Sequence, residues 1–177
     1  MLINEYGFTN LSLEEFEEYR KGPVVGVPSI NYLNMKKVTK DFNEFTYYKE
    51  RVPLSKDEDL PLVEEILPII KRTGAVAVLA HPSYHYPGSV MPIENLDFFK
   101  DLGIDGIECY CTYNKTKENF KYYVDYCNKN NIAISGGSDC HGDTYKERSI
   151  GVPHITLDMT NIIPKMKHYK HLQSDQA

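Results

Sequence analysis

The spacing of apolar residues divides the chain near residue 73 into a helical front part and a second part that contains strands. In the front part, apolar side chains recur every three or four residues, which predicts helices joined by polar turns. These helices are expected after Ser12, over Ser29–Lys37, after Asp41 and after Asp59, and Pro68 should kink the last of them. The expected organisation is a helical appendage over residues 1–58, βα units over 59–160 and a polar tail over 161–177.

The second part alternates between strand and helix patterns. The continuous apolar run Val76–Ala80 is typical of a strand buried on both faces, and further strands are expected at Ile104–Tyr110 and Ile132–Ser135. Helices are expected between them at about residues 94–102 and 116–129, and Ile155–Leu157 is a candidate fourth strand. This order predicts the α/β class, with a parallel sheet or barrel.

Net charge, cysteine content and the lack of long apolar stretches limit which partners and which cellular compartment we expect for this chain. The chain of 177 residues carries a formal charge of −5, which argues against an extended nucleic-acid surface but allows a small phosphorylated substrate. Its four cysteines include no Cys-x-x-Cys pair, so we expect reduced thiols and a cytoplasmic protein. No signal peptide and no apolar stretch near 18 residues are found, so we expect no membrane partner.

Candidate metal ligands follow two of the expected strands. His81 comes directly after the run 76–80, and Asp139 and His141 follow the strand 132–135. Parallel α/β folds place their sites at these carboxyl ends, and Asp139 and His141 would share one face of an extended segment. Gly136-Gly137 would let the backbone turn sharply into the site. A carboxylate beside imidazoles suits a metal shell, whereas a structural histidine and a capping aspartate are the plainer alternatives.

Three segments carry a family resemblance: Gly74–Pro82 (GAVAVLAHP), Gly103–Tyr110 (GIDGIECY) and Ile134–Gly142 (ISGGSDCHG). Their order and spacing resemble the polymerase and histidinol phosphatase (PHP) family, in particular its metal-dependent phosphoesterases that act on nucleotides or short oligonucleotides. The resemblance is strong over about residues 60–152, and Gly26–Leu33 looks like a helical insertion of that branch. It implies a distorted (β/α)7 barrel and two or three divalent ions, which are Zn, Mn, Fe or Mg. It also implies that His81, Asp139 and His141 are metal ligands, with Asp139 and His141 in the catalytic centre.

The chain also departs from the family pattern. Family members begin with a His-x-His strand and further ligands, whereas His81 is the first histidine here. We therefore expect a partial barrel, as a C-terminal portion, one half of a split enzyme or a decayed relative. Alone it should be inactive, and a missing N-terminal half or a second copy is the expected partner. A non-catalytic binding module derived from the fold and a mononuclear hydrolase with two histidines and one aspartate remain alternatives.

Four further residues are candidates for a supporting role. Glu108 ends the strand Ile104–Tyr110 and could face the site, either as a ligand or behind one. Ser83 and His85 follow His81, and Arg148 follows the Asp139 loop, so each could contact a phosphate. A solvated surface role is the alternative for all four.

Overall fold

The computed structural model describes residues 8–23, 27–49, 61–141 and 148–165. The chain forms two compact units. One contains residues 1–60 and 140–149, and the other contains 61–139 and 150–177. His81, Glu108 and Asp139 therefore share a unit, whereas His141 and Arg148 are assigned to the other one.

The described part of the first unit is helical. It contains α2 (Leu13–Lys21), α3 (Pro28–Met35) and α4 (Phe42–Lys49). The Ser12 hydroxyl accepts a hydrogen bond from the Glu15 backbone N–H at 3.2 Å, and the Asp41 carboxylate accepts one from the Glu44 N–H at 3.0 Å. Both side chains satisfy amides that have no partner within a helix, which confirms the predicted helix starts.

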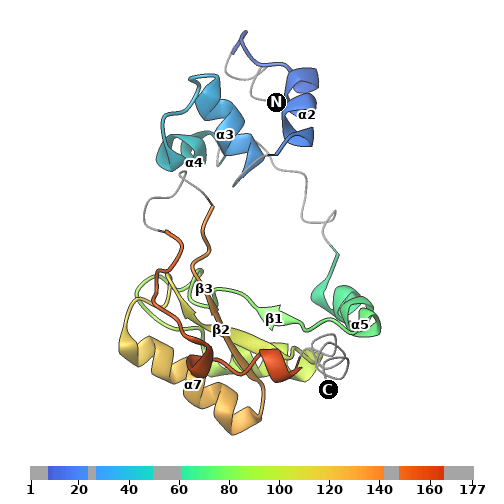
Figure 1. The fold of residues 1–177 in the computed structure, drawn as a ribbon, viewed down its shortest axis with the longest axis vertical. Coiled ribbons are helices and arrows are strands. Elements are labelled where there is room, and N and C mark those ends of the chain that lie inside the picture. The colour runs from blue at the N-terminus through green and yellow to red at the C-terminus, as the bar shows by residue number, and fades with distance from the viewer. Residues whose placement is uncertain (1–7, 24–26, 50–60, 142–147, 166–177) are drawn as a thin grey trace, which may run out of the picture. The chain divides into compact units, whose positions relative to one another are not determined.

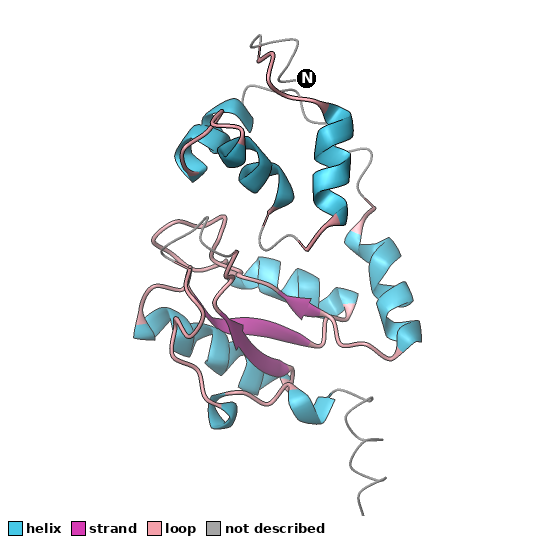
Figure 2. Cartoon of the chain, turned by 45° about the horizontal axis from the view of Figure 1, so that its top comes forward, coloured by secondary structure: helices cyan, strands magenta, loops and turns pink. Residues whose placement is uncertain are grey.

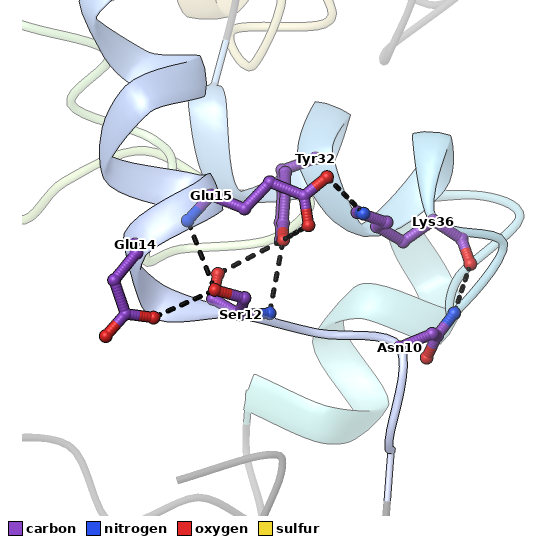
Figure 3. Close-up of polar contacts among 6 residues, drawn as sticks. All are labelled: Asn10, Ser12, Glu14, Glu15, Tyr32 and Lys36. Atoms are coloured by element: carbon purple, nitrogen blue, oxygen red, sulfur yellow. Dashed lines mark hydrogen bonds and ion pairs between the residues drawn. The ribbon is translucent and has the colours of Figure 1, made fainter.

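A polar network around Tyr32 joins α2 to α3 (Figure 3). The Tyr32 side chain is buried, and its hydroxyl donates to the Ser12 carbonyl at 3.1 Å. The Glu15 carboxylate forms an ion pair with Lys36, and one of its oxygens lies 3.3 Å from the Tyr32 hydroxyl, which shares its single proton between this oxygen and the Ser12 carbonyl. Glu15 therefore ties the two helices together instead of folding back onto Ser12 to complete a capping box.

The second unit contains a parallel sheet with helices packed against it (Figures 1 and 2). Along the chain come α5 (Val63–Thr73), β1 (Val78–Leu79), α6 (Ile93–Leu102), β2 (Gly106–Cys111), α7 (Lys117–Asn130) and β3 (Ala133–Gly137). The strands lie in the order β1-β2-β3, and both pairs are parallel. The predicted alternation of strand and helix in one α/β unit is confirmed, although the described strands do not form a barrel.

Helix α7 supplies much of the core beneath the sheet. Thr116 caps it by accepting from the Asn119 N–H at 3.1 Å, and Asn131 ends it with a φ of 52°. Tyr123 and Cys127 are fully buried against Ile107 of β2. Their spacing explains why both are buried, because residues four apart lie on the same side of a helix.

The starts of α5 and β1 differ from expectation. Leu62 is the N-cap residue of α5, and its backbone N–H donates to the Glu65 carboxylate at 2.9 Å, so the expected start after Asp59 is wrong. Asp59 itself lies outside the described residues. Strand β1 spans two residues instead of five, and both are only half-buried. Just before it, the Asp105 carboxylate accepts the Ala77 N–H at 2.8 Å, which replaces a strand contact.

The expected strand at Ile155–Leu157 is also absent. Thr156 is extended, and a short 3₁₀ helix, η2 (Leu157–Met159), follows it, with a second one, η3 (Ile163–Lys165), further along. Between them, Asn161 pairs with Ile134 of β3: its side-chain oxygen accepts the Ile134 N–H at 2.7 Å, and its own N–H donates to the Ile134 carbonyl at 3.1 Å. Asn161 thus provides strand-like hydrogen bonds without a fourth strand.

Candidate functional site

The register of β2 and β3 brings two side chains together beyond the ends of the strands. Cys111 of β2 pairs with Gly137 of β3, and Tyr113 and Asp139 each lie two residues further along. In a parallel pair, equal steps beyond paired residues end near each other. Accordingly, the Tyr113 hydroxyl donates a hydrogen bond to the Asp139 carboxylate at 3.1 Å.

The register of β1 and β2 brings the Glu108 side chain to the His81 backbone. Leu79 pairs with Ile107; Glu108 is the next residue on β2, and His81 lies two residues beyond Leu79, where its N–H donates to the Glu108 carboxylate at 2.7 Å. His81 and Asp139 both have positive φ, 31° and 50°. Positive φ is uncommon for residues other than glycine, although Asp and His adopt it more often than most, and such backbone conformations cluster at functional sites.

The positive φ of Asp139 corrects one expectation. Strand β3 ends at Gly137, so Asp139 and His141 do not lie in one regular extended segment. The expected alternation along a strand therefore does not place the two side chains on one face.

Gly136 and Gly137 serve close packing, not the predicted sharp turn, since both belong to β3. A Cβ atom at Gly136 would lie 2.8 Å from the Tyr110 carbonyl oxygen. One at Gly137 would lie 2.6 Å from the Glu108 carboxylate. The missing side chain at Gly137 thus makes room for Glu108, whose other oxygen holds the His81 loop.

Aromatic side chains line this end of the sheet. The Tyr113 ring lies 5.4 Å from the His81 ring and 5.1 Å from the Tyr84 ring, measured between centroids. The Tyr84 ring in turn lies 5.5 Å from the His81 ring, which closes a triangle of three rings. Tilted and edge-to-face packing of this kind fixes the orientation of the imidazole.

The electrostatics of the site centre on Glu108. Burial raises the pKa of the Glu108 carboxyl, and the nearby charge of Asp139 adds to the rise. The hydrogen bond from the His81 backbone and the charge of the His81 ring act in the opposite direction on this pKa. A buried carboxyl whose ionisation is opposed by a neighbouring carboxylate favours a bound cation, because positive charge would relieve the repulsion.

The donor types fit a divalent metal ion, but the number of gathered donors is small. Imidazole nitrogen and carboxylate oxygen are the ligands that zinc and manganese accept. Within the described residues, however, no three His, Cys, Asp or Glu side chains are arranged to hold a metal ion. The predicted set of His81, Asp139 and His141 stays a prediction, because His141 belongs to the other compact unit.

The other predicted site residues are placed as follows. Ser83 is 3% exposed, and its hydroxyl lies 2.8 Å from the Tyr123 hydroxyl, so it is engaged within the unit and not presented to a substrate. His85 is exposed, and its ring packs edge-on against Tyr84 at 4.7 Å. Arg148 lies in the first unit, and its contact with a phosphate remains a prediction.

The sequence did not point to Tyr113, Tyr84 or Tyr123. Tyr123 lies in the core, and its hydroxyl accepts the Met91 N–H at 2.7 Å and thereby fixes the loop that carries His81. Tyr113 follows β2 just as Asp139 follows β3. The position of Tyr113 just after a predicted strand was therefore the feature of the sequence that could have marked it as a site residue.

A scan against protein-family models and a search of curated proteins both find no match. A search of solved structures finds the crystal structure of a proposed metal-dependent phosphoesterase from Bifidobacterium adolescentis, with a TM-score of 0.53 and 20% sequence identity. The alignment covers 73% of this chain and 46% of the other, so this chain spans less than half the length of that protein. At this identity the likeness shows a shared fold. No described helix is long and apolar enough to cross a membrane.

Proposed function

We propose that the second unit carries part of the active site of a metal-dependent phosphoesterase, with nucleotides or short oligonucleotides as the substrate class. The observation that carries this proposal is that His81 and Asp139, which follow β1 and β3 and both have positive φ, each lie close enough to Glu108 to influence the pKa of its carboxyl. The likeness in fold to a proposed metal-dependent phosphoesterase supports it.

Each residue has a distinct task in this proposal. A bound divalent cation would neutralise charge on the phosphoryl group and lower the pKa of a coordinated water. The His81 imidazole and the Asp139 carboxylate would hold it, and Glu108 fixes the His81 backbone through its 2.7 Å hydrogen bond. His141, two residues after Asp139, is the further ligand that the resemblance implies. Because the described residues gather fewer than three such side chains, we expect weak cation binding by this chain alone.

Metal stoichiometry tests the proposal. The full chain is dialysed against Mn²⁺, which prefers oxygen and nitrogen ligands to thiols, and the bound metal is measured by mass spectrometry. We expect binding that Asp139→Asn weakens and that Asp125→Asn, a change on the exposed face of α7, leaves intact. Two or three ions indicate a multinuclear site, and one ion indicates the mononuclear alternative. No binding by the folded chain refutes both.

Phosphate binding then tests the reaction class. With radiolabelled inorganic phosphate as the probe, retention by the chain should appear when Mn²⁺ is present and disappear when it is removed or when Asp139 is changed to Asn. Retention of Mn²⁺ without any effect on phosphate would remove the phosphoesterase proposal and leave only a metal site.

A non-catalytic binding module is the second candidate. The observation in its favour is that the described residues hold no group of three metal-binding side chains. It predicts neither Mn²⁺ nor phosphate binding, so the same two measurements separate it from the first candidate.

A further inference from the structure

Tyr113 lies against both candidate ligands, although no motif pointed to it. We propose that Tyr113 is a positioning residue that orients the Asp139 carboxylate for cation binding through the hydrogen bond of its phenol. This inference rests on the proposed function, because it assigns to Asp139 the role of a ligand. It concerns a side chain that the resemblance does not implicate.

Hydrogen bonds from Asn114 to the end of β2 fix the turn that carries Tyr113. The Asn114 N–H donates to the Cys111 carbonyl at 3.1 Å, which closes a tight turn after β2. The Asn114 side chain is fully buried, and its amide donates to the Cys109 carbonyl at 2.7 Å. A buried side-chain hydrogen bond back to the strand fixes the turn, so the direction of the Tyr113 side chain is set by the fold.

Asp139 needs such an external support. It lies two residues beyond the end of β3 in a left-handed backbone conformation, so strand pairing does not fix its carboxylate. The phenol engages the Oδ2 atom of the Asp139 carboxylate at 3.1 Å. Carboxylate ligands are held by such outer hydrogen bonds, and their removal costs about 10–100-fold in metal affinity.

The ring of Tyr113 couples Asp139 to His81. Its centroid lies 5.4 Å from that of the His81 imidazole, at a tilt of 58°. One rigid side chain therefore contacts the carboxylate through its hydroxyl and the imidazole through its ring. Tyr113→Phe keeps the ring and removes the hydroxyl, so it isolates the hydrogen bond.

The test is the Mn²⁺ affinity of the full chain, measured from the electron paramagnetic resonance signal of the free ion. We expect Tyr113→Phe to weaken binding by about tenfold. Tyr126→Phe is the matched control, because it removes another tyrosine–aspartate hydrogen bond, from the Tyr126 hydroxyl to Asp97 at 2.8 Å, and should change binding less than about twofold. Thermal melting of each variant reports whether a loss of affinity follows from a loss of folded protein.

A double variant distinguishes positioning from general structural support. If the phenol acts through Asp139, adding Tyr113→Phe to Asp139→Asn should cost nothing further, whereas independent effects would add. Unchanged affinity in Tyr113→Phe, or full additivity in the double variant, overturns the inference while the proposed function stands. A folded wild-type chain that binds no Mn²⁺ overturns both.

Discussion

The Glu108 carboxylate accepts a hydrogen bond from the backbone N–H of His81 at 2.7 Å, and this contact joins the end of β1 to the middle strand of the sheet. Burial raises the pKa of Glu108 above its ordinary value. The folded state therefore binds this proton more tightly than the unfolded state does. Glu108 contributes most to stability below the unfolded pKa of about 4.5, and that contribution is lost as pH rises through the folded pKa.

Glu108→Gln should consequently stabilise the metal-free chain at pH 7, because it removes a buried charge and keeps an oxygen that can accept the His81 N–H. The gain over the wild type should shrink toward pH 4, where the wild-type carboxyl is protonated. Urea denaturation at both pH values measures the difference. If the variant were less stable than the wild type at pH 7, the prediction would be wrong, because favourable contacts of the charged Glu108 carboxylate would then outweigh the cost of burying it.

Two glycines in the sheet should respond differently to alanine. A Cβ at Gly106 would lie 2.7 Å from the Ala133 carbonyl oxygen, which is backbone and cannot move freely. Gly106→Ala should therefore destabilise the unit by about 1–3 kcal/mol. Gly137→Ala meets only the end of the Glu108 side chain, so it should cost less stability but displace Glu108 from His81. Chemical denaturation measures the first effect, and equal losses in both variants would contradict the distinction.

The hydroxyl of Tyr123 should matter more than its position in the core suggests. It contacts the Ser83 hydroxyl at 2.8 Å and accepts the Met91 N–H at 2.7 Å, both inside the unit. Tyr123→Phe would leave these buried groups without that partner and should cost about 1–3 kcal/mol. Tyr122→Phe, which removes a part-buried hydrogen bond to the Met91 carbonyl, is the control and should cost less. Amide exchange over residues 81–91 should increase in Tyr123→Phe, and unchanged exchange would contradict this role.

The free energy of unfolding should decrease at alkaline pH because the thiol of Cys111 is buried. Burial raises the pKa of Cys111 to about 11 from an ordinary value of 9.0. The unfolded chain loses this proton first, so the free energy of unfolding decreases as pH rises from about 9 to 11. Cys111→Ala should flatten that decrease, as measured by urea denaturation at pH 8, 9 and 10. An identical slope in the variant would exclude Cys111 as a cause.

Helix α7 of the second unit was predictable because each rule that fixed it is local. Thr116 begins α7 and Asn131 ends it, each through contacts within one turn of its own position. The buried face of α7 follows from the spacing of its apolar residues alone. Strand β1 was overestimated because its length depends on Asp105, a residue distant in sequence whose carboxylate takes the Ala77 N–H. Periodicity contains no information about such a contact.

The site was predictable only in part for the same reason. His81 and Asp139 could be placed at strand ends from the order of the elements, but Tyr113 enters through the register of β2 against β3, which the sequence does not display. The left-handed backbone at Asp139 likewise depends on packing around the end of β3. Neither feature follows from residue type.

The central claim is that His81 and Asp139 bind one cation, and anomalous diffraction from a crystal soaked in Zn²⁺ tests it most directly. The account predicts a peak about 2 Å from a His81 ring nitrogen and about 2 Å from an Asp139 carboxylate oxygen. The peak should weaken or vanish in Asp139→Asn crystals soaked in the same way. A well-occupied peak elsewhere, with none between His81 and Asp139, would contradict the account.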